Sequence, residues 1–220
     1  MDDNMKYTHA NLNDAYIDMG MWRIALGFKL YLMTFTFNPI GGSEETKKRI
    51  MIDEIERLYA KLLNYTFRHP AKVGALEKPL WIYAHDCPVP KGGGFNRDHL
   101  FNIVQNDGLH GHAIALQPPV SRMKKGLQTY VEDNQERIHG AGHAFFQVDV
   151  REVEKDPAYV IGYATKSLRR KRIDAGEMLV LPKAPSEITR YSAYERDLMR
   201  QDEETKRAAR IKARAASSYS

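Results

Sequence analysis

Cysteine is almost absent from this sequence, since Cys87 is the only one among 220 residues. This excludes a disulfide framework and a zinc site built on thiolates, and makes a reducing cytoplasm the expected location. No apolar run approaches the about 18 residues that a membrane span needs. The first residues, MDDNMKYTHANLND, lack the pattern of a signal peptide. We therefore expect a cytoplasmic protein that does not bind membranes.

Internal repeats and low-complexity segments are missing as well. Hydrophobic residues make up 43% of the chain and charged residues 28%, which is ordinary for a globular protein. The length suits one domain of common size with an added tail. We place the domain at residues 1–185 and a charged helical tail at 186–220.

Acidic residues are in deficit only toward the C-terminus. Lysine and arginine number 33 against 28 acids, a net charge of +5. Residues 1–166 hold 20 of each sign, so the excess lies in 167–220, where 13 basic residues face 8 acids. It is concentrated in RRKR at 169–172 and KRAARIKAR at 206–214. Such clusters suit a polyanion such as nucleic acid, although a solvated surface can have the same composition.

Apolar periodicity and turn-forming residues predict a mixed order of helices and strands. Strands are expected at 29–38, 79–86, 109–116 and 143–153, with a Pro/Gly-rich connection at 87–108. Helices are expected at 11–25 with Asn13 or Asp14 as cap, at 44–67 after the cap Ser43, near 126–138, from Pro157 after the cap Asp156, and from about 186. This order predicts an α+β fold in which helices pack on one face of an antiparallel sheet.

Two histidines stand one residue apart in LHGHAIAL, residues 109–116, inside a predicted strand. Because side chains alternate along a strand, His110 and His112 share one face with Ile114, and Gly111 lies on the other. Paired imidazoles can hold one divalent metal ion. A His-x-His pattern on a strand also occurs without any metal role, so the pattern alone leaves both interpretations open.

A second pattern, YVIGYATK, follows the predicted start of the last helix of the domain. Tyr159, Tyr163 and Lys166 recur at helical spacing and would share one face. Such a stripe can be half-buried aromatic packing with a lysine that reaches to solvent. Alternatively a tyrosine is a nucleophile, which requires a polarised electrophile or a nearby cation because a phenol has a pKa near 10.

Three segments of the chain resemble, in the same order, the three motifs of the HUH endonucleases. They are YLMTFTFN, then HGH with AIALQPP, then FQVDVREV leading into YVIGYATK. More narrowly, they resemble the rolling-circle replication initiators of plasmids and single-stranded DNA phages. The resemblance covers roughly residues 29–170. It departs from the family at Gly111, where a bulky hydrophobic residue is usual and a close backbone approach would explain the glycine. The loop before the histidine strand is also longer and richer in glycine than usual.

The resemblance implies a ferredoxin-like sandwich with a single Mg²⁺ or Mn²⁺ ion. His110, His112 and a third polar side chain would hold this ion, which polarises the scissile phosphate. A tyrosine then attacks phosphorus, keeps the 5′-phosphate and releases a 3′-hydroxyl. The segment KGGGF does not match the P-loop pattern, and no P-loop occurs elsewhere in the chain, so the helicase domain of some initiators is not expected.

The third metal ligand is expected at the end of the strand 79–86. His85 and Asp86 would point to opposite faces there. We favour His85, because Trp81 and Tyr83 on its side continue a coherent face. Asp86 stays open, because an acid is common at this place in the family.

We assign the nucleophile to Tyr163, which alone has a lysine three residues later. Lys166 would neutralise phosphate charge or orient the tyrosine. Tyr159 is either a second catalytic tyrosine, as in some initiators, or a packing residue, since Gly162 stands where the paired form would repeat the lysine. The cluster RRKR would continue this helix beside the DNA; its residues are Arg169, Arg170, Lys171 and Arg172.

Two further histidines, His139 and His143, flank the segment GAG. We expect loop residues there that contact DNA or simply lie at the surface. The function predicted from the sequence is a replication initiator that nicks and rejoins single-stranded DNA at an origin or hairpin, with a host helicase and polymerase as partners. The alternatives are a relaxase or single-strand transposase of the same superfamily, and a non-catalytic nucleic-acid-binding module.

Overall fold

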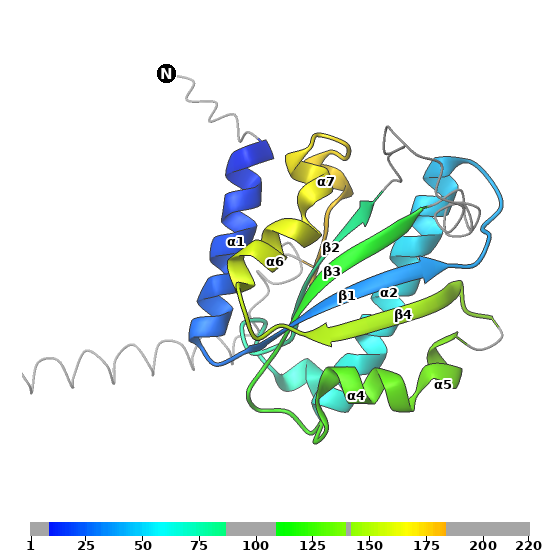
Figure 1. Ribbon diagram of the computed structural model, residues 1–220. Coiled ribbons are helices and arrows are strands. Elements are labelled where there is room, and N and C mark those ends of the chain that lie inside the picture. Colours follow the sequence, from blue (N-terminus) through cyan, green and yellow to red (C-terminus); the bar gives the residue numbers. More distant parts are fainter. Residues whose placement is uncertain (1–8, 87–108, 140–141, 184–220) are drawn as a thin grey trace, which may run out of the picture. The chain divides into compact units, whose positions relative to one another are not determined.

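The computed structural model describes residues 9–86, 109–139 and 142–183 (Figure 1). The chain divides into two units, Met1–Pro182 and Lys183–Ser220, and the account below concerns the first. The predicted connection at 87–108, the helix from about 186 and the domain boundary at 185 lie outside the described residues, so they stay predictions. Within the described ranges, no helix combines the length and apolar character that crossing a membrane would need.

Five strands form the sheet, and the four that were predicted are confirmed to within about two residues. They are β1 (Lys29–Phe37), β2 (Leu80–Asp86), β3 (His110–Gln117), β4 (Phe145–Glu152) and β5 (Leu179–Leu181). The fifth strand was not predicted, because three residues are too few for a periodic pattern. The helices are α1 (His9–Ala25), α2 (Glu44–Thr66), α4 (Gly126–Asp133), α5 (Gln135–His139), α6 (Pro157–Ala164) and α7 (Lys166–Arg169), with short 3₁₀ turns at Pro70–Lys72 and Ala175–Glu177.

The sheet is antiparallel throughout, with the strand order β4-β1-β3-β2-β5. The histidine strand β3 is therefore central and hydrogen-bonded on both sides. Its first residue, His110, is paired with Thr36 at the end of β1 and with Asp86 at the end of β2. This register places the start of β3 between the C-terminal ends of β1 and β2, and the candidate site lies at this end of the three strands.

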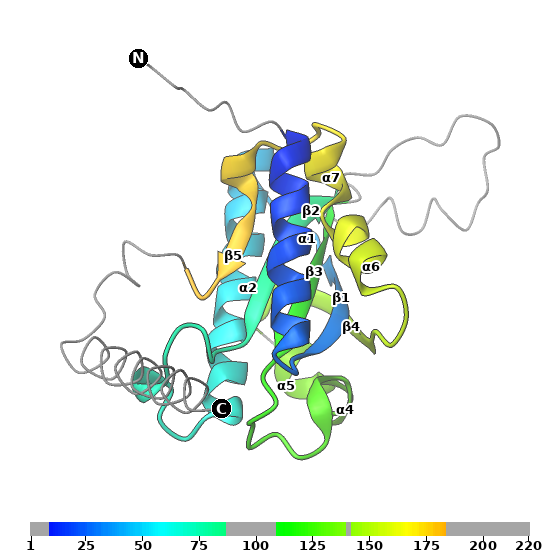
Figure 2. The same ribbon diagram turned by 90° about the vertical axis from the view of Figure 1, so that its left-hand side faces the viewer.

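Helices cover both faces of the sheet, which corrects the expectation that they pack on one face (Figures 1 and 2). On one face, α1 and α6 bury a cluster that includes Ile82, Ile114 and Ile161. On the other, α2, α4 and α5 bury the larger cluster, which includes Phe35 and Trp81. The inner strands β1, β2 and β3 carry apolar residues on both sides, and this sequence property requires two covering layers.

The helix caps follow the sequence only in part. Ser43 caps α2 as predicted, since its hydroxyl accepts the Thr46 N–H at 3.3 Å. Asn13 does not cap α1 but is buried within it. Asp156 has a left-handed backbone with φ of 49° and makes no side-chain cap, although Pro157 does begin α6. The single helix predicted near 126–138 is instead α4 and α5, separated at Asn134.

Candidate metal centre

The two strand histidines project from the face of the sheet that α1, α6 and α7 cover. His110 and His112 lie on the side of Ile114, while Leu109 and Ala113 belong to the core on the opposite face. The predicted alternation is therefore confirmed. The two imidazole rings are 5.1 Å apart and nearly perpendicular. His110 is partly exposed and His112 is buried, so the pair forms the wall of a site that is open on one side.

Asp86 joins these histidines from the neighbouring strand. Its Oδ2 atom lies 3.4 Å from His110 Nε2 and 3.6 Å from His112 Nε2. Ligands bound at about 2.1 Å to one ion lie roughly 3 Å apart when they are adjacent, so small movements would bring all three donors to one ion. Among the described residues, this is the one group of histidine, cysteine and acidic side chains whose arrangement could hold a metal.

His85 does not belong to this group, which corrects the preference for it as third ligand. It is paired with Gly111, so its side chain points to the face of α2. There its Nδ1 lies 2.9 Å from the Tyr83 hydroxyl and its ring is 1% exposed. Burial, followed by the charge of Lys48, lowers the pKa of His85 to about 4. His85 is therefore a neutral core residue, and the coherent face formed with Trp81 and Tyr83 is the hydrophobic core.

The buried Asp86 carboxylate is stabilised by several donors. Burial opposes its ionisation, but His110, His112 and Lys166 outweigh this effect and hold the pKa of Asp86 well below its usual range. Lys166 Nζ lies 2.6 Å from Oδ2, and the Ser167 hydroxyl donates to Oδ1 at 2.9 Å. Asp86 is therefore negatively charged, with Lys166 as its counterion.

His112 is held in the neutral form that can bind a metal. Burial first, and then the charge of Lys166, lowers its pKa, although Asp86 acts in the opposite direction. The Thr34 hydroxyl of β1 lies 3.3 Å from His112 Nδ1 and fixes the ring from behind. A partner on the far nitrogen is the usual way in which proteins orient a metal-binding imidazole.

Tyr163 and Lys166 reach the cluster from the short helices α6 and α7. The Tyr163 ring lies 5.5 Å from the His112 ring, and Lys166 Nζ is 4.1 Å above the Tyr163 ring. The two residues are not on one continuous helix, because α6 ends at Ala164 and α7 begins at Lys166. The turn between them is fixed by Thr165, whose hydroxyl donates to Asn13 of α1 at 2.7 Å. Tyr159 is one turn away on α6 and 73% exposed.

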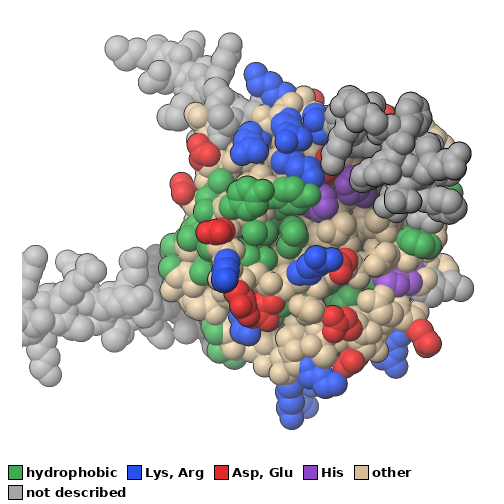
Figure 3. Space-filling view, in the orientation of Figure 1, with side chains coloured by type: hydrophobic (Ala, Val, Ile, Leu, Met, Phe, Trp, Pro, Cys, Tyr) green, Lys and Arg blue, Asp and Glu red, His purple; other side chains and the backbone are tan. Residues whose placement is uncertain are grey.

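The basic cluster RRKR does not continue the tyrosine helix. Arg169 is the last residue of α7, and Lys171 has a left-handed backbone with φ of 54°, which ends the helix. Arg169, Arg170 and Lys171 are exposed, whereas Arg172 is half-buried. Figure 3 shows lysine and arginine side chains gathered in the region of α7, next to histidine side chains. The positive charge therefore follows α7 on a turn, and its place beside DNA stays a prediction.

The space beside the Gly111 backbone is too small for any side chain. A Cβ atom built on it would lie 2.2 Å from Cε2 and 2.4 Å from the hydroxyl of Tyr83. The Tyr83 ring thus lies directly against the Gly111 backbone, on the face opposite the histidines. This confirms the close backbone approach that was offered to explain the glycine in the resemblance to the HUH motif.

His139 and His143 lie on the α2 and α5 side of the sheet, opposite the cluster. His139 is the last residue of α5 rather than a loop residue, and its Nε2 accepts the Val148 N–H at 3.0 Å. His143 Nδ1 lies 3.6 Å from a carboxylate oxygen of Glu54. Both side chains therefore have structural partners, and contact with DNA stays a prediction.

Four residues around the site were not predicted to belong to it: Thr34, Ser167, Thr165, and Asn13, which the sequence suggested only as a helix cap. Small hydroxyl and amide side chains carry no periodic signal, and their roles depend on contacts across the sheet or between helices. Thr34 and Thr165 had a usable clue, because they lie in the first and the last of the segments that resemble the HUH motifs.

The chain was compared with protein-family models, with curated proteins and with solved structures, and none of the three comparisons found a match. The chemistry of the site therefore rests on its own geometry. Two imidazoles and one buried carboxylate suit a divalent ion, and this donor set does not select one ion among several.

Proposed function

We propose that this chain is a metal-dependent endonuclease of the HUH type, which nicks and rejoins single-stranded DNA to initiate replication of a plasmid or phage. One observation supports this above all others. Tyr163 and Lys166 lie against a cluster of two histidines and one aspartate, in the combination that the sequence motifs suggest. A purely structural cluster would need Lys166 as the counterion of Asp86, but it would not need a partly exposed phenol beside His112.

The residues of the cluster fit a divalent ion, with Mg²⁺ or Mn²⁺ as the ions that the resemblance implies. Such an ion, held by Asp86, His110 and His112, would withdraw charge from the scissile phosphate. Tyr163 is 38% exposed, so its hydroxyl can reach a strand that lies over the cluster. Its oxygen bonds to phosphorus as the bond from phosphorus to the 3′-oxygen breaks, and the phenolic proton balances the 3′-hydroxyl that leaves.

Lys166 has two roles in this proposal. Its ammonium neutralises Asp86 and lies above the Tyr163 ring, so it favours negative charge on the attacking oxygen and on the phosphate. Arg169, Arg170 and Lys171 would hold the strand by its phosphates. Because the phosphotyrosine bond conserves the energy of the broken bond, the same site can rejoin the strand without a nucleotide cofactor.

The test is cleavage of labelled single strands that tile the DNA flanking the gene, in Mn²⁺, followed by denaturing gel electrophoresis. We expect a shortened strand and a covalent protein–DNA adduct. His110→Ala/His112→Ala should abolish both, whereas His69→Ala, which removes an exposed imidazole outside the cluster, should abolish neither. Binding of the strands by wild-type protein without any cleavage would instead favour the non-catalytic nucleic-acid-binding module.

A further inference from the structure

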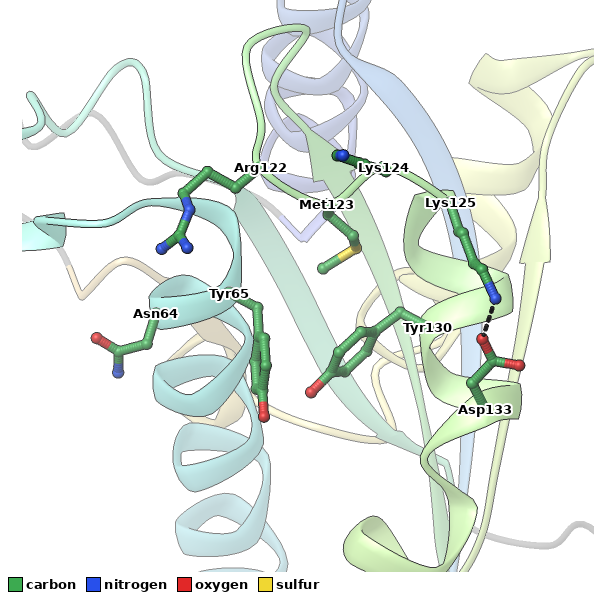
Figure 4. Close-up of a pocket in the computed structure, with 8 residues that line it drawn as sticks. All are labelled: Asn64, Tyr65, Arg122, Met123, Lys124, Lys125, Tyr130 and Asp133. Atoms are coloured by element: carbon green, nitrogen blue, oxygen red, sulfur yellow. Dashed lines mark hydrogen bonds and ion pairs between the residues drawn. The ribbon is translucent and has the colours of Figure 1, made fainter.

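A cavity of about 440 Å³ lies far from the metal cluster. It is formed by the end of α2, the loop that follows β3 and the helix α4 (Figure 4). The histidines are at the start of β3 and this loop is at its end, so roughly 20–25 Å of strand separates the two sites. The cavity also lies on the α2 and α4 side of the sheet, whereas the cluster faces α6. Its volume is in the range of small-ligand pockets.

Two tyrosine rings form the apolar part of the cavity. Tyr65 of α2 and Tyr130 of α4 have ring centroids 4.7 Å apart, tilted by 51°. Figure 4 shows them side by side below Met123. Tyr65 is 39% exposed, so one large ring is accessible from solvent although it is held by a neighbouring ring. An exposed and preordered aromatic ring is a surface on which another flat ring can stack.

Three cations form the rim. Arg122, Lys124 and Lys125 are exposed and follow one another closely along the loop, while Asp133 is the one acid among the lining residues. Lys125 binds that acid, with 2.8 Å from its Nζ to Oδ2. The charges of Arg122 and Lys124 therefore exceed the negative charge of the lining, and this favours an anionic ligand.

The loop that carries these cations is anchored. The Arg122 N–H donates to the Thr66 carbonyl oxygen at the end of α2, at 2.9 Å. The Met123 N–H donates to the Ser121 hydroxyl at 3.0 Å. The loop backbone that carries the cations is thus held against the end of α2, next to Tyr65, and this limits the entropy lost when a ligand binds to both.

We propose that this cavity binds one nucleotide unit, with its base stacked on Tyr65 and its phosphate at Arg122 and Lys124. A nucleotide joins a flat ring to a phosphate within one small molecule, and the cavity offers a partner for each. The unit can come from a free nucleotide or from a single strand of nucleic acid. This proposal does not rest on the metal cluster, because neither the ring nor the cations belong to it.

The test uses two probes in buffer with EDTA, which removes any role of the metal site. The first is a fluorescein-labelled oligothymidylate in anisotropy titrations, and the second is thymidine monophosphate as ligand and as competitor. Tyr65→Ala should weaken binding about fivefold or more, the lower limit for one base stacked on an aromatic ring. Tyr65→Phe keeps the ring and should bind within about twofold of wild type. Each variant is accepted only if its thermal unfolding matches wild type.

Arg122→Ala/Lys124→Ala should weaken binding and reduce its salt dependence, because fewer counterions are released. Arg151→Ala/Lys155→Ala removes the same charges from exposed positions elsewhere and should leave the Kd unchanged. If the monophosphate binds directly and needs Tyr65, the ligand is a free nucleotide. If only the oligonucleotide binds in this way, the ligand is a strand.

A local readout separates this cavity from the basic residues near α7. An oligonucleotide with 5-iodouracil, irradiated in the complex, should crosslink to the peptide that contains Tyr65. Crosslinks confined to other peptides, or Tyr65→Ala binding both probes like wild type, would overturn the proposal. Neither result depends on cleavage, so failure here leaves the proposed nuclease function unaffected, and loss of cleavage leaves this proposal unaffected.

Discussion

Replacing Gly111 with alanine should destabilise the protein strongly, although only one methyl group is added. The new Cβ would lie 2.2–2.6 Å from three atoms of the Tyr83 side chain, and real Cβ atoms do not approach so closely. Gly111 is on the central strand, so its backbone is hydrogen-bonded on both sides and cannot withdraw. The Tyr83 ring cannot withdraw easily either, because it is fully buried against Phe35.

The magnitude follows from these constraints. Overpacking a core costs about 1–3 kcal/mol when neighbours can adjust, and more when they cannot. We expect Gly111→Ala to lower the free energy of unfolding by about 3 kcal/mol or more. For a domain of this size, each kcal/mol changes the Tm by roughly 2–4 °C, so the Tm should fall by about 6–12 °C.

Thermal and urea unfolding, followed by circular dichroism, measure this effect. The matched control is Gly162→Ala on α6, where the nearest atom, Ile17 Cδ1, is 3.5 Å from the added Cβ. That substitution should be neutral or stabilise by up to about 1 kcal/mol, because glycine is a poor helix former. In the Gly111→Ala background, Tyr83→Leu should cost less than it does in wild type. A Gly111→Ala protein with the Tm of wild type, or strictly additive effects, would refute the packing argument.

The remaining predictions concern the cluster and its surroundings. Asp86→Asn should weaken Mn²⁺ binding by about tenfold or more, whereas His85→Gln should leave it nearly unchanged; isothermal calorimetry measures both, and equal losses would contradict the assigned ligand set. Tyr163→Phe should bind DNA but form no covalent adduct on a denaturing gel, and Tyr159→Phe should still form one; the reverse pattern would move the nucleophile to Tyr159. His85 is neutral in the folded protein with a pKa of about 4 and titrates near 6.5 when unfolded, so its stabilising contribution is complete above pH 6.5 and is lost as the pH falls toward 4. The stability advantage of wild type over His85→Gln should therefore fall by about 3 kcal/mol between pH 7 and 4, and a constant difference in urea unfolding would refute the assignment.

The sequence predicts the strands well, because their alternation is a local property. It also predicts that His110 and His112 share a face, for the same reason. The third ligand, His85 or Asp86, does not follow from local sequence, because it depends on which face of β2 meets those histidines. That is a property of the register between β2 and β3, where Asp86 is paired with His110.

The sequence also contains the information that predicts helices on both faces of the sheet. In β1, Leu30 and Leu32 are apolar on one side, while Met33 and Phe35 are apolar on the other. A strand with two apolar faces is covered on both. By contrast, the break at Thr165 could not be predicted, because it depends on a hydrogen bond to Asn13, more than a hundred residues earlier in the chain.

The strand order has a consequence for the newly made chain. The first strand to leave the ribosome, β1, pairs with β3 and β4, which are both made later. Among the strands that the structure describes, only β2 and β3 are consecutive along the chain and also adjacent in the sheet. The cluster is completed later still, when Lys166 arrives to neutralise Asp86. Non-local pairing delays folding. An unfinished chain that ends before α6 would therefore carry Asp86, His110 and His112 without Tyr163, and the candidate metal centre would meet its tyrosine only after α6 is made.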